Sequence, residues 1–143
     1  MNIMRMATTA LILCLAYYIA PAQGVIKVTF ADLESNEGQV FVCLFNQESG
    51  FPGKMEQALR VEKVAVADRQ ARYTFGDLPL GTYAVSVMHD RNDDGDIEKN
   101  FMGMPKEKVG ISNVTGGRPT FEKAAFALTT DEPTVALTIK PFN

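Results

Sequence analysis

Short runs of alternating apolar and polar residues recur along the chain and predict β-strands. Residues 25–30 (VIKVTF) and 134–140 (TVALTIK) place their apolar side chains at every second position, the pattern of a half-buried strand. Residues 82–90 (TYAVSVMHD) alternate in the same way. Residues 39–45 (QVFVCLF) are apolar on both faces, which predicts a central strand that is covered on both sides.

Turn signals separate these runs from two further strands and one ambiguous segment. Residues 60–67 and 71–75 are typical of strands, and the short connection 68–70 between them predicts a hairpin. Residues 121–124 fit a turn of helix, with a strand beginning at Ala125. About seven short strands without a long amphipathic helix favour an all-β fold, a single antiparallel β-sandwich such as the immunoglobulin-like type.

A long stretch, residues 89–113, has no hydrophobic period of its own. It begins at the end of a predicted strand and runs through acids, amides, Gly, Pro and Lys. Stretches of this length in a small domain are usually functional loops or disordered segments. We therefore expect one long loop here, and it is the main candidate for function.

The first 22 residues have the features of a secretory signal peptide. Arg5 supplies a positive charge, residues 7–20 are apolar and uncharged, and small residues precede a cleavage point after Ala22. The apolar run is shorter than the roughly 20 residues of a membrane-spanning helix. Leu13 before Cys14 argues against lipidation of that cysteine. We expect export to the periplasm, the medium or the cell surface, no membrane insertion after cleavage, and a β-sandwich domain at residues 23–143.

The charge and the cysteine content of the chain limit the kinds of partner and chemistry that we expect. Lys and Arg number 14 against 17 Asp and Glu, a net charge of −3, and loss of Arg5 would make the mature chain more negative. This mild acidity disfavours nucleic acid as a partner and is compatible with a cation. Cys43, the one thiol left after cleavage, lies in an apolar strand pattern. It is interpreted as a small buried hydrophobe rather than a nucleophile.

The beginning of the long loop matches the opening of a calcium-binding loop. Asp90-x-Asn92-x-Asp94-Gly95 fits the pattern D-x-[DN]-x-[DN]-G. Ca²⁺ takes six to eight oxygen ligands, and oxygens at alternate positions of a tight turn can converge on it. In such a loop the next ligand is the main-chain carbonyl of Asp96, and Glu98 acts through water.

The match to an EF-hand then fails. Phe101 stands where the bidentate Glu belongs, and a predicted strand rather than a helix precedes the loop. A calcium site here would be weak and completed from elsewhere in the chain or by water. The alternative is an acidic hairpin tip in which Asn and Asp cap their own backbone.

A hydrolase based on His89 and Ser112 is a third hypothesis. His89 is the one histidine of the chain, but it and Asp90 are adjacent on a strand and point to opposite faces. Nothing around Ser112 resembles a nucleophile elbow. We expect His89 at the inner end of its strand, hydrogen-bonded to a loop carbonyl.

Two patterns carry a resemblance to known families. The run Leu78-Pro79-x-Gly81-x-Tyr83-x-Val85 resembles a signature of prealbumin-like and carboxypeptidase-regulatory sandwich domains, in which the Gly turns the chain and the Tyr packs between the sheets. A second pattern covers most of the long loop and continues beyond it: His89-Asp90, Asn92, Asp94-Gly95, Glu98, Asn100-Phe101, Gly103, Pro105-Lys106-Glu107, Gly110, Ser112-Asn113, Pro119, Phe121-Glu122 and Ala124. It resembles an uncharacterised family of small exported bacterial proteins, domain of unknown function 2141. The likeness departs at Val109 and Ile111, where aromatic residues are expected.

This second resemblance implies an exported bacterial β-sandwich without an established activity. Our first hypothesis is a non-catalytic binding module that uses residues 89–113 to hold Ca²⁺ or to contact a protein, peptide or glycan. The metal candidates are Asp90, Asn92, Asp94, Asp96 and Glu98, and the other loop candidates are His89, Lys106, Ser112 and Asn113. The alternative hypothesis is a structural or protein-interaction sandwich without a metal.

Overall fold

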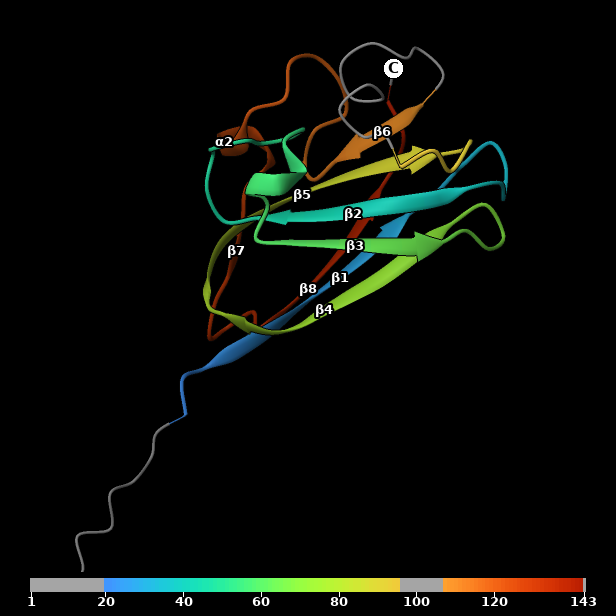
Figure 1. The fold of residues 1–143 in the computed structure, drawn as a ribbon. Coiled ribbons are helices and arrows are strands. Elements are labelled where there is room, and N and C mark those ends of the chain that lie inside the picture. The colour runs from blue at the N-terminus through green and yellow to red at the C-terminus, as the bar shows by residue number, and fades with distance from the viewer. Residues whose placement is uncertain (1–19, 96–106, 143) are drawn as a thin grey trace, which may run out of the picture.

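Two β-sheets face each other and confirm the all-β sandwich (Figure 1). The structure is a computed structural model, and it describes residues 20–95 and 107–142. Within these residues no helix is long and apolar enough to cross a membrane.

The smaller sheet has three strands in the order β4-β1-β8. Their bounds are β1 Gln23–Phe30, β4 Ala71–Pro79 and β8 Thr134–Ile139. β1 pairs antiparallel with β4 and parallel with β8. Alternation predicted β1 and β8. Their parallel pairing differs from the antiparallel sandwich expected, because periodicity does not encode the direction of a neighbouring strand.

The larger sheet has the order β3-β2-β5-β6, and β7 pairs with the beginning of β5. All of its pairs are antiparallel. Its strands are β2 Gln39–Phe45, β3 Arg60–Ala65, β5 Gly81–Asp90, β6 Lys108–Ile111 and β7 Phe126–Leu128. β5 is the longest strand and contacts β2, β6 and β7, so it positions most of the candidate residues.

The core between the sheets consists of the inward side chains of both sheets. Phe30 from β1, Leu44 from β2 and Val85 from β5 are fully buried in one cluster. Tyr83 belongs to the same cluster, and its hydroxyl donates a hydrogen bond to the Pro79 carbonyl (2.5 Å). The packing of this Tyr between the sheets agrees with the expectation from the first pattern.

Loops and a short helix cover the outer face of the larger sheet. The Phe51 ring packs edge-on against Phe45 of β2 (5.2 Å between centroids) and against Phe121 (5.8 Å). Phe121 begins α2, Phe121–Ala124, whose first turn is capped by the Thr120 side chain. A short 3₁₀ helix, η1 (Met55–Gln57), follows the Phe51 loop. This cover explains why β2 is apolar on both faces.

The structure corrects the extent of the long loop. The strand predicted at residues 82–90 is confirmed as β5, which includes His89 and Asp90, whereas β6 (Lys108–Ile111) pairs with it within the stretch that was expected to be loop. β6 escaped prediction because it is four residues long and contains Gly110, so its strand form depends on pairing with β5 rather than on its own pattern. The predicted helical turn at residues 121–124 and the strand after it are confirmed as α2 and β7.

Candidate functional site

Asp90 is the last residue of β5 and is fully buried. Its Oδ2 accepts a hydrogen bond from the Gly95 N–H (3.0 Å). Its Oδ1 is also buried and has no hydrogen-bond partner among the described residues. A buried carboxylate oxygen without a partner carries a desolvation cost. A cation bound next to this oxygen would offset that cost.

The turn after Asp90 is built from short polar side chains. The Asn92 amide donates to the Asp94 carboxylate (2.8 Å), and Asp93 and Gly95 have positive φ values of 51° and 67°. Asp93 points to the surface, where it pairs with Lys63 of β3 (3.1 Å). These internal bonds are those of the acidic hairpin tip that we gave as the alternative to a calcium loop.

Glu107 is a fourth acidic residue at this turn, and it was not among the metal candidates. It immediately precedes β6. Because Lys108 of β6 pairs with His89 of β5, Glu107 lies next to the end of β5. Glu107 Oε2 accepts a long hydrogen bond from the Arg91 N–H (3.4 Å). Burial raises the pKa of Glu107, the Arg91 N–H lowers it, and the negative charges of Asp90 and Asp94 raise it further. The site therefore concentrates negative charge.

The neighbouring cations have acidic partners of their own. The Arg91 guanidinium pairs with Glu34 (3.6 Å) and Glu37 (3.5 Å), and Lys108 also contacts Glu34 (3.3 Å). Arg91 is therefore directed toward the β1–β2 connection.

The donor set suits a hard cation. Carboxylate and amide oxygens are the ligands that Ca²⁺ and Mg²⁺ prefer, whereas zinc sites use Cys and His. Across residues 20–95 and 107–142, however, no three His, Cys, Asp or Glu side chains already form a group that could hold a metal ion. Of the predicted ligands, Asp96 and Glu98 lie outside the described residues, as does Lys106.

His89 faces the space between the sheets and is fully buried. Its Nε2 is 2.6 Å from the Glu37 carbonyl oxygen. Because a carbonyl oxygen only accepts, Nε2 is the donor in this hydrogen bond. The expected bond to a loop carbonyl is confirmed, and Nδ1 has no partner in the described part of the chain.

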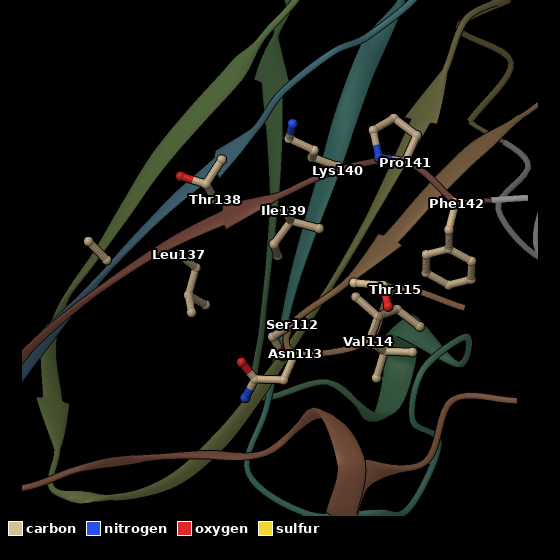
Figure 2. A pocket seen from close by; sticks show the side chains of 12 residues that line it. Ser112, Asn113, Val114, Thr115, Leu137, Thr138, Ile139, Lys140, Pro141 and Phe142 are labelled. Carbon is tan, nitrogen blue, oxygen red and sulfur yellow. The ribbon is translucent and has the colours of Figure 1, made fainter. Parts of the chain in front are cut away.

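Ser112 and Asn113 fasten the segment after β6 to its neighbours. The buried Ser112 hydroxyl accepts from the Val85 N–H (3.0 Å) and donates to the Ala124 carbonyl (2.8 Å). Asn113, at a φ of 57°, donates to the Ala125 carbonyl (3.2 Å). Both residues line a pocket of about 670 Å³ beside β8 (Figure 2), but the Ser112 hydroxyl is engaged in these bonds.

The hydrolase pair is not assembled. The Ser112 N–H donates to the Val85 carbonyl (2.9 Å), which places Ser112 four positions from His89 along β5. Four strand residues span roughly 13 Å. Proton transfer needs hydrogen-bond contact or a single bridging water, so this geometry does not support the third hypothesis.

A known protein family matches most of this fold. The profile of a family described as an uncharacterized protein conserved in bacteria, domain of unknown function 2141, matches residues 28–136, more than half of the chain. The chain belongs to this family. The domain of unknown function 2141 covers the Asp90 turn, Glu107 and the Ser112 links, so the candidate site lies inside the family's domain. No curated protein and no solved structure matches the chain.

Proposed function

We propose that this bacterial protein is an exported, non-catalytic binding protein, and that the acidic end of β5 binds a divalent cation, foremost Ca²⁺. The observation that carries the proposal is Asp90, whose carboxylate is fully buried and has one oxygen without a hydrogen-bond partner among the described residues. The family description supports the bacterial origin. Export rests on the apolar, uncharged run at residues 7–20 and the small residues before position 23.

Under this proposal, four side chains near the end of β5 would supply oxygen to the ion. Asp90, Asn92 and Asp94 come from the turn after β5, and Glu107 comes from the residue before β6. Glu107 would replace the bidentate glutamate of an EF-hand, whose position in this sequence is occupied by Phe101. A divalent cation would reduce the repulsion among the three carboxylates, which in its absence contributes to the raised pKa of Glu107.

Binding requires a local rearrangement. Because the described acids do not yet form a metal-holding group, the Asp94 carboxylate would have to exchange the Asn92 amide for the ion. Breaking that contact lowers the affinity, and water would complete the shell. We expect a dissociation constant of roughly 10⁻⁴ to 10⁻³ M, the range of extracellular calcium modules. A bound ion would leave coordination positions for a carboxylate or hydroxyl of a protein, peptide or glycan partner.

Calorimetry and thermal unfolding test the proposal on protein purified after expression of the full chain. Addition of Ca²⁺ should release or absorb heat saturably and raise the melting temperature. At a tenfold excess over the dissociation constant, the stabilisation should be about 1.4 kcal/mol. Asp90→Asn and Glu107→Gln should abolish or strongly weaken this response.

Asp93→Asn is the matched control. Asp93 lies in the same turn and carries the same charge, but it pairs with Lys63 at the surface. The calcium response of this variant should therefore equal that of the wild type. Absence of heat and of any melting shift at millimolar Ca²⁺ would refute cation binding. An equal loss in the Asp93 and Asp90 variants would refute the assignment of the site.

A further inference from the structure

β8 presents an edge without a partner strand within the described residues, because it pairs only with β1. At the two ends of this pair, the Val25 N–H donates to Pro133 (2.7 Å) and the Ala31 N–H donates to Ile139 (2.9 Å). In a parallel pair, every second residue of a strand directs both its N–H and its C=O to the neighbouring strand, and the residues between direct theirs the other way. Along β8 and the residue before it, the residues that bond to β1 are therefore the odd-numbered ones, 133 to 139. The backbone N–H and C=O groups of Thr134, Ala136 and Thr138 therefore point away from β1.

The composition of β8 differs from that of the other outer strands. Proteins usually protect exposed sheet edges with charges, proline, bulges or very short strands. β3 carries Arg60, Glu62 and Lys63, and β4 carries Arg72, Asp77 and Pro79. β7 has three residues and β6 has four, and Phe142 and Val114 form bridges to β6. β8 (TVALTI) has neither charge nor proline.

We propose that the edge of β8 pairs with β8 of a second copy of this chain. The two strands run antiparallel about a two-fold axis at Ala136. Thr134 of each copy then faces Thr138 of the other, and each facing pair exchanges two backbone hydrogen bonds, about six in all. Such an interface is isologous, with the same surface contributed by both copies.

Charge complementarity selects this register. Glu132 precedes β8 and Lys140 follows it, and both are exposed. Centring the pair on Ala136 places each Glu132 opposite Lys140 of the other copy, and a shift by two residues in either direction loses this match. In the single chain Lys140 pairs with Asp32 (3.0 Å) at the surface, and exchanging such an exposed ion pair costs little.

The pocket beneath this edge supports the same partner. It is bounded by the end of β8 and by the turn at residues 111–115. In Figure 2, Leu137 and Ile139 project from β8 toward Asn113 and Val114, whereas Thr138 projects to the opposite side. Leu137 is only partly buried in the single chain. A strand added to β8 would cover the mouth of this pocket and bury more of its apolar wall.

Light scattering coupled to size exclusion tests the dimer with protein purified after expression of the full chain. The wild type should have twice the monomer mass at high concentration and dissociate on dilution. Ala136→Pro should remain a monomer, because its ring occupies the outward side of β8. The Ala136 N–H does not bond to β1, so the proline leaves the fold's own ladder intact.

Charge reversal tests the register without a backbone change. Glu132→Lys and Lys140→Glu should each weaken the dimer, and the double variant should restore it. Lys63→Glu is the matched control, because Lys63 is also paired at the surface but lies on β3. It should leave the dimer unchanged.

Hydrogen exchange provides an independent readout. The Ala136 N–H should become protected as the protein concentration rises. A wild type that stays monomeric at all concentrations would overturn the proposal, even if it binds an extended peptide. A dimer that survives both Ala136→Pro and the single charge reversals would also overturn it, because the interface would then lie elsewhere.

Discussion

Replacing Ser112 with alanine removes a buried hydroxyl that joins three parts of the larger sheet and its cover. The Ser112 hydroxyl accepts from the Val85 N–H of β5 (3.0 Å) and donates to the carbonyl of Ala124 at the end of α2 (2.8 Å). In Ser112→Ala the Val85 N–H loses this acceptor in a site that water does not reach. Among the described residues the Ala124 carbonyl keeps a longer contact, from the Asn113 side chain (3.4 Å).

The expected cost follows from these two bonds. A buried polar group left without its partner costs about 1–3 kcal/mol, and a partly replaced bond adds less. We expect Ser112→Ala to lower the free energy of unfolding by about 2 kcal/mol. This is a large share of the roughly 5–15 kcal/mol that stabilises a typical domain.

Urea unfolding measures this change, as a lower transition midpoint with an unchanged slope. Ser35→Ala is the control, because the Ser35 hydroxyl makes one exposed bond, to the Glu37 N–H (3.3 Å). We expect less than about 0.5 kcal/mol for the control. If Ser112→Ala costs no more than the control, the structural role assigned to Ser112 is wrong.

Three further predictions concern Glu107, Cys43 and Gly110. Glu107→Gln should stabilise the metal-free protein at neutral pH, because burial raises the pKa of Glu107 and the charged carboxylate therefore destabilises the fold. The gain should vanish when the pH falls below the ordinary pKa of a glutamate, where Glu107 is uncharged in both the folded and the unfolded chain. Cys43 should resist alkylation until the protein unfolds, because burial raises its pKa to about 12. Gly110→Ala should cost about 1–3 kcal/mol, because the new Cβ would lie 2.5 Å from Ile139 and 2.8 Å from Phe30.

Each of these predictions has a distinct contrary result. Thermal melts of Glu107→Gln across pH would count against the reasoning if the gain persisted in acid. Rapid alkylation of native Cys43, followed by mass spectrometry, would show that its site is open. Chemical unfolding of Gly110→Ala with unchanged stability would show that β6 and β8 can separate slightly at no cost.

The strands with a clear period could be predicted from the sequence, and their pairing could not. Alternation identified β1 and β8, which each bury one face, and it also located β5, although β5 is buried on both faces from Tyr83 to Asp90. The apolar faces of β2 correctly indicated cover on both sides. The parallel pairing of β1 with β8 leaves no mark on the alternation of either strand, since both bury one face regardless of direction.

The sequence predicted the part of the candidate site that follows β5 but missed the part that precedes β6. The spacing of Asp90, Asn92 and Asp94 is local in the chain and therefore visible in the sequence. Glu107 reaches the same place through β6, a strand formed by a tertiary contact. The signal that could have revealed it was the alternation of Val109 and Ile111 just after Glu107, which is compatible with a short strand opposite His89.

The family pattern contains residues of two kinds. Gly110 faces Phe30 and Ile139 where a side chain does not fit, and Ser112 and Asn113 bond to the end of α2 and the residue after it. Gly110 lets β6 pack closely against β1 and β8, and Ser112 and Asn113 hold the segment after β6 against the end of α2. Asp90 has no such use for its second oxygen within the described residues. His89 of the same pattern also has a buried atom without a partner there, Nδ1, and under the cation proposal a bound ion would supply the partner of the Asp90 oxygen.

The most direct test of the cation site is a Ca²⁺ titration followed through the amide resonance of Gly95. This N–H donates to Asp90 Oδ2 (3.0 Å), so it reports on the carboxylate itself. The cation proposal predicts a saturable shift of the Gly95 resonance in the wild type and in Asp93→Asn, and none in Asp90→Asn. A Gly95 resonance that does not move in the wild type at millimolar Ca²⁺ would contradict the proposal.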